Sequence, residues 1–381
     1  MLVQMHFLQN YAPSNLNRDD TGAPKDAFFG GMRRGRVSSQ CLKRSIRLSP
    51  VFREAFDADG LLGVRTKRLP KLIEDELKKQ GADAPTIEAI VRRLPEIGRE
   101  SKKKSTAADK EGEGDKTPTR EAESATRQLI FVGKDEIPRL ATSLWQRYRK
   151  IGPAKWPKEE ISEITKGLGS SLPRSVDIAM FGRMTTSSAF EDVQAAVQVA
   201  HAISTNALVQ EFDYYTAVDD ISGESGAGMI GDIEFNSNTY YRYLNVHWEQ
   251  LVQNLGGDVD VARRATLVLL EAAAKAHPSG KQNSFAAFSL PDVILVEVTQ
   301  DNLPVSYANA FLKPARPRGD QSLMDASVAL LSDYMERVIP VYNLEAERAY
   351  TALDPSHQLP RAQHCPSLSD LRNWLEKQLP E

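Results

Sequence analysis

The chain has 381 residues, of which 41% are hydrophobic and 26% are charged, and its formal net charge is −3. This composition excludes disorder throughout the chain, and the length allows a large core or two or three domains. No apolar run approaches a membrane span, and the first residues lack the basic start and apolar segment of a signal peptide, so we expect a cytoplasmic protein. Two cysteines are too few for a disulfide scaffold, and we expect both to be reduced.

Positive charge is concentrated near the N-terminus. Residues 1–50 contain eight lysines and arginines against three aspartates, and the segment GGMRRGRVSSQCLKRSIR at 30–47 contains six basic residues and no acid. A helix that begins at the N-cap residue Ser38 places apolar residues on one side and, on the other, Lys43, Arg44 and Arg47. The preceding arginines and backbone amides suit phosphate oxygens. A solvated basic face is the alternative interpretation.

The sequence begins with a strand-like alternation over residues 1–13, and a mostly helical insertion is predicted for residues 48–170. Helices are predicted at 69–80 and, with Thr86 as the cap, at 86–94. The segment 99–120 has 12 charged residues out of 22 and no aromatic residue, valine, isoleucine or leucine. Because such a segment cannot bury enough surface to order itself, we predict a mobile loop there.

Residues 175–204 are predicted to form a strand followed by a helix. The strand is SVDIAMF, and Arg183 and Met184 lie in the turn after it. Ser188 and Glu191 fit a capping box for the helix. On one interpretation Met184 fills a gap in the core; on the other it packs against a displaced base beside Arg183.

Residues 211–235 predict a projecting hairpin around a glycine-rich turn. Its aromatic and β-branched residues either pack on a sheet or insert between bases. The GxGxxG spacing that ends at Gly231 is followed by strand residues, so it does not predict a dinucleotide site. Strands at 239–247 and 293–299 flank a helix at 259–276. Together these elements predict an α+β fold whose sheet is split by an insertion.

Signals of other chemistry are weak. The six histidines are dispersed, and none stands in an HxxxH or HExxH pattern. The pairs Asp19–Asp20 and Asp219–Asp220 fit either a divalent-metal site for phosphodiester cleavage or turns capped by the carboxylates. We predict no resident metal or cofactor.

Seven segments together resemble a known family. They are SNLNRDD (14–20), KDAFFGGMRRGRVSSQCLKRSIR (25–47), VDIAMFGRM (176–184), VAHAISTN (199–206), DYYTAVDD (213–220), YYRYLNV (240–246) and LPVSYANAF (303–311). Their order and spacing resemble the CasC family, the Cas-seven-type backbone subunits of subtype I-E CRISPR Cascade. The resemblance covers nearly the whole chain and is less close in the insertion and after about residue 312.

The resemblance implies an α+β fold with an RRM-like (ferredoxin-like) palm, a helical fingers insertion and a protruding β-hairpin thumb. The implied ranges are 1–47 for the first part of the palm, 48–172 for the fingers with the disordered loop 99–120, 173–206 for the second part of the palm, 207–238 for the thumb, and 239–381 for the palm completion and C-terminal helices.

The resemblance also implies a set of site residues. The RNA-binding residues are Arg18, Lys25, Ser38, Ser39, Gln40, Lys43, Arg44, Arg47, Arg183 and Met184. The thumb residues expected to wedge between bases are Tyr214, Tyr215, Thr216 and Val218, where the family often has Trp-Phe at the first two positions. The remaining arginines, Arg33, Arg34 and Arg36, are assigned to the interface with the next copy.

The implied function is that of a non-catalytic CRISPR RNA (crRNA)-binding subunit in antiviral defence. Copies oligomerise along the guide, grip its phosphates and kink it periodically, so that the segments between kinks pair with target DNA. The implied partners are the crRNA, the target strand, other copies, the large, small and end-capping Cascade subunits, and a helicase-nuclease that the complex recruits. One alternative is a metal-dependent ribonuclease that acts on guide-paired RNA through Asp19 or Asp219. Another is a generic single-strand RNA chaperone.

Overall fold

The computed structural model describes residues 1–97, 125–126, 129–166, 168, 175–185, 187, 189–218, 221 and 227–381. The predicted loop at 99–120, the pair Asp219–Asp220 and Ser188 lie outside the described residues. The chain divides into two compact units. The first unit comprises Met1–Ala55, Val197–Glu249 and Arg263–Glu381, and the second comprises Phe56–Ala196 and Gln250–Ala262.

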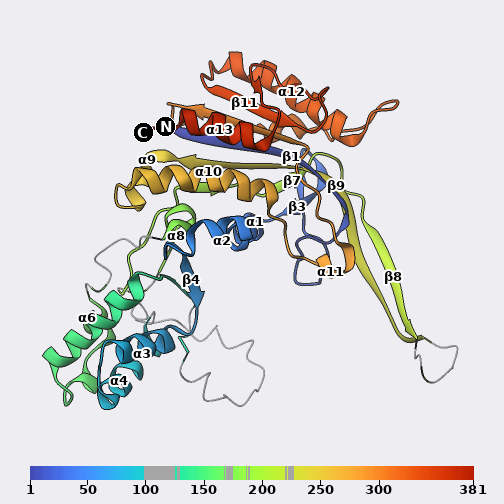
Figure 1. Cartoon of the computed structure of the whole chain (residues 1–381). Coiled ribbons are helices and arrows are strands. Elements are labelled where there is room, and N and C mark those ends of the chain that lie inside the picture. The colour runs from blue at the N-terminus through green and yellow to red at the C-terminus, as the bar shows by residue number, and fades with distance from the viewer. Residues whose placement is uncertain are drawn as a thin grey trace. The chain divides into compact units, whose positions relative to one another are not determined.

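The first unit is built on a ten-stranded sheet (Figure 1). The strands run in the spatial order β12-β11-β10-β1-β9-β7-β3-β2, and β6 and β8 also pair with β9. Their bounds are β1 Leu2–Ser14, β2 Asp26–Phe29, β3 Met32–Val37, β6 Val197–Val199, β7 Ala202–Ser204, β8 Glu211–Val218, β9 Ala227–His247, β10 Val293–Thr299, β11 Glu347–Ala352 and β12 Gln363–His364. The predicted strands at 1–13, 239–247 and 293–299 are therefore confirmed.

The helices of the first unit lie in the connections between these strands. α1 (Ser39–Leu48) lies between β1 and β7 in the chain, and α10 (Val259–Lys275), whose first residues belong to the second unit, lies between β9 and β10. The others are α2 (Pro50–Phe56), α11 (Gln282–Phe285), the 3₁₀ helix η3 (Tyr307–Phe311), α12 (Leu323–Val341) and α13 (Leu368–Gln378). α9 (Trp248–Asn254) begins in the first unit and lies mostly in the second. Because α10 begins one residue after Asp258, whose side chain accepts a hydrogen bond from the backbone of Val261, the predicted helix at 259–276 is confirmed with its cap.

Both faces of the central strands are covered, because alternate residues belong to different cores. Leu8, Tyr241 and Leu295 pack with residues of α12 in one core. Tyr11 and Tyr240 pack with Leu42 of α1 in another. Almost every residue of β1 is therefore buried, and the alternation visible in the sequence marks two cores rather than a core and a solvent face.

A polar network lies within the first of these cores. Nδ1 of His6 lies 2.8 Å from the hydroxyl of Tyr241, and its Nε2 lies 3.0 Å from a carboxylate oxygen of Glu297. Tyr307 donates to the other oxygen of Glu297 at 2.8 Å, and Arg348 also donates to it. Each polar group thus has a partner, and the network joins four neighbouring strands to η3.

The second unit is mainly helical. Its core contains Leu69, Ile73 and Leu77 of α3, which pack with Leu140 and Leu144 of α6. The elements are β4 Gly63–Thr66, α3 Leu69–Lys79, α4 Ala84–Val91, η1 Leu94–Glu96, β5 Ile130–Gly133, α6 Glu136–Ile151, η2 Trp156–Lys158, α7 Ile161–Thr165 and α8 Val176–Phe181. The predicted helix at 69–80 is confirmed. The predicted cap at Thr86 is wrong, because α4 begins at Ala84 and Asp83 occupies the N-cap position.

Two predicted elements around residue 190 are also wrong. The predicted strand SVDIAMF forms the helix α8, whose six residues are all buried. A short helix that is buried all round shows no helical periodicity, so the sequence cannot distinguish it from a strand. The predicted helix after Ser188 is replaced by turns and by β6 and β7, because Val197 and Val199 pair with β9. Sheet pairing there outweighs the local helical pattern.

The division into units differs from the predicted ranges at three places. Residues 48–55, predicted as fingers, lie with the first unit. Residues 175–196 and 250–262, predicted as palm, lie with the second unit. Among the described residues no helix is long and apolar enough to cross a membrane.

Candidate nucleic-acid interface

The predicted basic helix is present as α1. Ser38 is its N-cap, and its hydroxyl accepts a hydrogen bond from the backbone N–H of Cys41 at 3.3 Å. The backbone N–H of Ser38 donates to the side chain of Asn17 at 2.9 Å, which fixes the entry of the chain into the helix. Leu42 and Ile46 are buried. Gln40 is exposed, and the cap residue itself acts by holding the helix N-terminus in place.

The cationic side of α1 lies near the basic residues of the preceding segment. Burial raises the pKa of the Cys41 thiol, while the positive charges of Lys25 and Arg44 lower it. Burial lowers the pKa of His201, and the charges of Arg36 and Lys25 lower it further. Lys25 is therefore close to both α1 and β7. Arg44 is exposed, and Lys43 and Arg47 are half-buried on the same helix.

A cavity of about 540 Å³ lies beside Lys25. Its lining carries the cations Lys25, Arg33 and Arg36 and the carboxylates of Asp19, Asp20 and Asp26. Arg33 forms an ion pair with Asp26, and Arg36 donates to the backbone oxygen of Asp26 at 3.0 Å. The cavity is therefore polar, with positive and negative groups in equal number.

Asp19 lines the same cavity and organises its loop. One of its carboxylate oxygens accepts hydrogen bonds from Thr21 N (2.9 Å), Thr21 Oγ1 (2.7 Å) and Ala23 N (3.0 Å). The hydrogen bond from the Thr21 side chain is the main cause that lowers the pKa of Asp19. For Asp19 the turn-capping interpretation is therefore confirmed.

Arg34 does not fit the predicted role at an interface between copies. Its side chain is buried, and the guanidinium donates to the backbone oxygens of Thr205 at 2.8 Å and Phe311 at 2.7 Å. Burial lowers its pKa. The arginine instead ties β3 to two neighbouring loops, because five fixed donors can satisfy several carbonyl groups at once.

Arg183 does not fit the predicted role of phosphate ligand. Its side chain is 2% exposed and forms a two-point ion pair with Glu136, with contacts of 2.6 and 3.0 Å. It also donates to the backbone oxygens of Glu191 and Phe131. The sequence could not reveal this role, because Glu136 lies 47 residues away. The next residue, Met184, is 94% exposed, so it does not fill a core gap.

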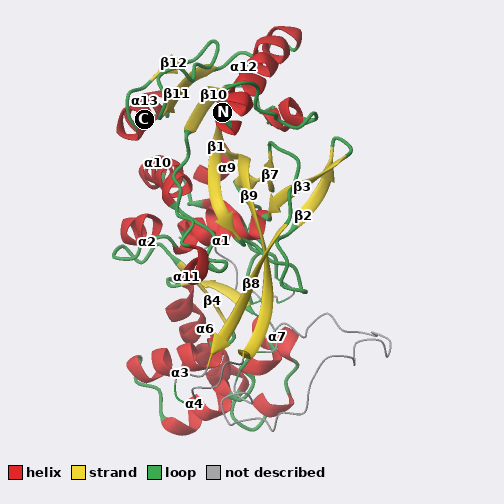
Figure 2. Cartoon of the chain, turned by 90° about the vertical axis from the view of Figure 1, so that its right-hand side faces the viewer, coloured by secondary structure: helices red, strands yellow, loops and turns green. Residues whose placement is uncertain are grey.

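The predicted hairpin is present as β8 and the first half of β9 (Figures 1 and 2). Its pairing places Tyr214 opposite Asp232 and Tyr215 opposite Gly231. Tyr214 is 64% exposed, whereas Tyr215 is 38% exposed. A Cβ atom on Gly231 would lie 2.5 Å from the Tyr215 hydroxyl, so the Tyr215 ring covers the backbone of the opposite strand.

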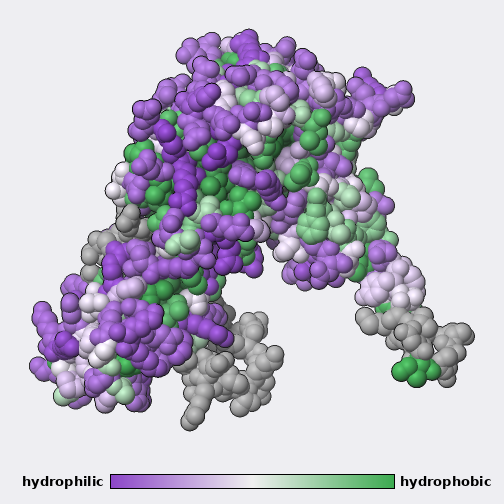
Figure 3. Space-filling model, viewed as in Figure 1, coloured by the Kyte–Doolittle hydropathy of each residue, from purple (hydrophilic) through white to green (hydrophobic). Residues whose placement is uncertain are grey.

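The two tyrosines point to opposite faces, because side chains alternate along a strand. Phe212, Tyr214 and Thr216 share one face, and Ile230 pairs with Thr216. Phe212 and Ile230 are about 60% exposed, and hydrophobic residues reach the surface of the hairpin (Figure 3). Phe212 and Ile230 were missed at the sequence level, although the spacing of two from Tyr214 would have identified Phe212. Val218 lies at the end of β8.

The sheet, the helix α1 and the exposed hairpin agree with the α+β fold that the resemblance to Cas-seven-type backbone subunits implies. The chain is 31% identical to a chain of a solved structure described as "CRISPR RNA-guided surveillance complex, pre-nicking", with a TM-score of 0.79 over 99% of this chain and 100% of that chain. A second chain, from a "CRISPR RNA-guided surveillance complex", is 27% identical with a TM-score of 0.70 over 99% and 100%. The model of the CT1975-like protein family matches residues 3–374, and the chain belongs to this family.

No curated protein matches the chain. The family match and the structural likeness confirm the predicted class of backbone subunit, and the predicted α+β class is confirmed with them. Subtype I-E stays a prediction.

Proposed function

We propose that the chain is a crRNA-binding backbone subunit of a type I-E Cascade surveillance complex. The observation that carries the proposal is the likeness, over 99% of the chain, to a chain of an RNA-guided surveillance complex. The basic surface of α1 supplies the chemistry, because a subunit that accepts any guide sequence must grip phosphates and leave base edges available for pairing.

The strand order supports an RRM-like palm in the first unit. β10, β1, β9 and β7 are neighbours in this order, and every neighbouring pair is antiparallel. α1 lies between β1 and β7 in the chain, and α10 lies between β9 and β10. A β-α-β-β-α-β chain with this spatial order is the ferredoxin-like arrangement. The helical second unit corresponds to the fingers, and the hairpin β8–β9 corresponds to the thumb.

Arg183 is excluded as a phosphate ligand because it is buried against Glu136. The proposed phosphate-binding residues are Arg18, Lys25, Ser39, Gln40, Lys43, Arg44 and Arg47. Ser38 supports them through the helix cap. Phosphates near the N-terminus of α1 gain from the backbone N–H groups there as well as from the cations. Met184, with its exposed apolar side chain, packs against the guide where it is kinked.

The thumb wedge consists of the face that carries Phe212, Tyr214 and Thr216. A base that is displaced from the guide offers an apolar surface, and an aromatic side chain compensates for part of the lost base stacking. Copies of the chain stack along the guide, with the other Cascade subunits and the target strand as partners, and a separate helicase-nuclease cleaves the DNA. The chain itself has no catalytic role in this proposal.

Salt-dependent RNA binding tests the proposal. We expect purified chain to bind crRNA with an affinity that falls as salt rises, and Lys43→Glu with Arg47→Glu to abolish assembly on the guide. Each lost phosphate contact with a single strand lowers the salt slope by about 0.7, so the milder Lys43→Ala with Arg47→Ala, which removes the two contacts without reversing the charges, should lower it by about 1.4. Arg372→Glu with Lys377→Glu on α13 makes the same charge change on another helix and serves as the control.

The proposal fails if the α1 variant assembles on crRNA as the wild type does, or if the α13 control loses binding equally. The ribonuclease alternative is tested in the same samples. It requires magnesium-dependent cleavage of RNA paired to the guide, abolished by Asp19→Ala, whereas we expect intact RNA.

A further inference from the structure

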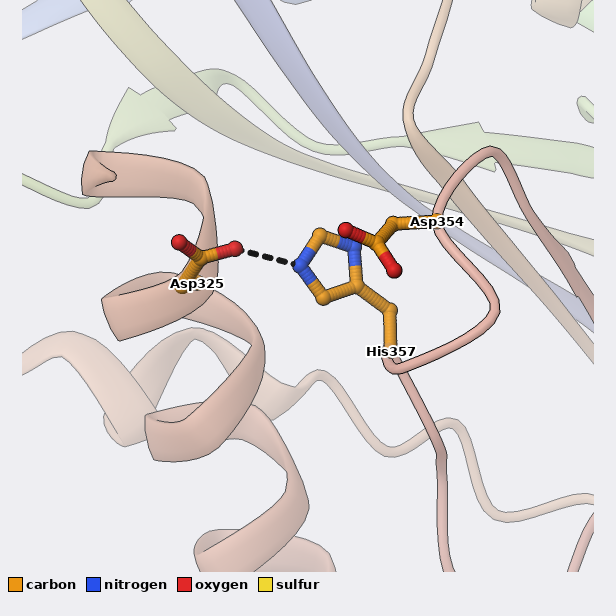
Figure 4. Close-up of side chains that lie close together, drawn as sticks. All are labelled: Asp325, Asp354 and His357. Carbon is orange, nitrogen blue, oxygen red and sulfur yellow. Dashed lines mark hydrogen bonds and ion pairs between the residues drawn. The ribbon is translucent and has the colours of Figure 1, made fainter. Parts of the chain in front are cut away.

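One imidazole lies between two carboxylates at the start of α12 (Figure 4). Nε2 of His357 lies 2.7 Å from Oδ1 of Asp325. Asp354, in the loop after β11, lies on the side of the second ring nitrogen (Figure 4). The ligand atoms of the three residues all lie within 4.8 Å of one another.

Local structure holds both carboxylates in place. Asp325 is the third residue of α12 and completes a capping box with Ser322. The Asp325 carboxylate accepts a hydrogen bond from the backbone N–H of Ser322 at 2.7 Å, and the Ser322 hydroxyl accepts one from the backbone N–H of Asp325 at 3.1 Å. Asp354 accepts from the backbone N–H of Ser356 at 2.8 Å, and its backbone oxygen accepts from the N–H of His357 at 3.0 Å. Each carboxylate still has lone pairs for another ligand.

The second ring nitrogen of His357 is the unusual feature. His357 is 8% exposed, and its Nδ1 is buried without a hydrogen-bond partner among the described residues. Because Nε2 contacts a carboxylate, which only accepts, Nε2 carries a proton and the neutral ring has its lone pair on Nδ1. A buried lone pair beside a carboxylate is unfavourable unless a cation lies between them.

We infer that Nδ1 of His357 and the carboxylate of Asp354 bind a divalent transition-metal ion, with Asp325 orienting the imidazole through the Nε2–H hydrogen bond. A ligating histidine whose other N–H donates to a carboxylate is the usual arrangement of such sites. Imidazole with carboxylates suits zinc and its neighbours, whereas magnesium and calcium prefer oxygen ligands alone. The ion links two residues of the loop after β11, and the hydrogen bond from His357 to Asp325 holds this loop to the first turn of α12.

Calorimetric titration of tag-free, chelator-treated chain with zinc chloride tests the inference. We expect one zinc ion per chain and a raised melting temperature, a loss of affinity of at least tenfold in His357→Gln and Asp354→Asn, and no comparable binding of magnesium. His364→Gln removes an exposed histidine of β12 and should leave zinc binding unchanged.

Asp354 is exposed, so Asp354→Asn keeps the test available if His357→Gln does not fold. The inference is overturned if Asp354→Asn binds zinc as the wild type does, or if the wild type binds none. It is also overturned if nuclear magnetic resonance shows a doubly protonated His357 at neutral pH whose signals zinc leaves unchanged, because the ring would then be an imidazolium between two carboxylates.

Discussion

Replacing Arg183 by methionine separates a structural role from an RNA-binding role. The substitution keeps an unbranched apolar side chain but removes the ion pair with Glu136. Among the described residues, the Glu136 carboxylate then keeps one hydrogen-bond donor, the backbone N–H of Gly133 at 2.7 Å. The carboxylate is 8% exposed. An uncompensated buried charge of this kind costs about 3–5 kcal/mol, so we expect Arg183→Met to destabilise the second unit by that amount.

The control is an arginine that forms an exposed ion pair in the same unit. Arg139 pairs with Asp135 on α6, and its side chain is 45% exposed. Exposed pairs four residues apart contribute about 0.3–0.5 kcal/mol, so Arg139→Met should be nearly neutral although it removes the same charge. Glu136→Gln alone should be destabilising, and combining it with Arg183→Met should cost less than the sum of the two.

Urea unfolding followed by tryptophan fluorescence measures these differences. Trp156 is 1% exposed in the core of the second unit and reports on its unfolding. With a slope of about 2 kcal/mol/M, the Arg183→Met midpoint should fall by roughly 1.5–2.5 M. Equal midpoints for the Arg183 and Arg139 variants would refute the structural role. If Arg183→Met instead loses crRNA affinity, with a salt slope lower by about 0.7 and no loss of stability, the result would support the prediction that Arg183 contacts a phosphate.

Two further predictions concern the first unit. A Cβ atom on Gly30 would collide with the backbone oxygen of Leu312, whereas one on Gly31 meets nothing within 4 Å, and both glycines have positive φ. Gly31→Ala should therefore cost only the left-handed backbone strain of about 1–2 kcal/mol, and Gly30→Ala clearly more; equal losses in thermal unfolding would contradict this. Burial raises the pKa of Tyr11 to about 12, so its contribution to stability is fully present below pH 10, its ordinary pKa, and is lost as the pH rises toward 12. Tyr11→Phe should lose less stability than the wild type over this alkaline range, and an equal loss in the two proteins would show that folding does not raise the pKa of Tyr11.

The elements predicted well from the sequence have local causes. α1 follows from the cap at Ser38 and the spacing of Leu42 and Ile46, and β10 follows from its run of β-branched and apolar residues. The concentration of positive charge near the N-terminus is visible in the sequence in the same way, because Lys25, Arg36 and Arg44 are close in the chain.

The failures have causes that lie far away in the chain. Arg34 and Arg183 look like surface cations, but Thr205 and Glu136, which lie more than 40 residues away in the chain, hold them as structural residues. β6 and β7 form because β9 accepts them as neighbours, although the local pattern resembles a helix. Local sequence patterns predict local elements such as α1. They do not predict which charged side chains are buried, because that depends on partners distant in the chain.

β9 serves two parts of the first unit at once. Its 21 residues pair with β1 inside the sheet and with β8 in the hairpin. Phe212, Tyr214 and Ile230 of the hairpin are exposed, so the buried half of the same strand sets the face that they occupy. Insertion of one residue between the two halves would turn Tyr214 to the opposite side, whereas insertion of two would restore it. Evolution can therefore lengthen this arm only in steps of two residues per strand.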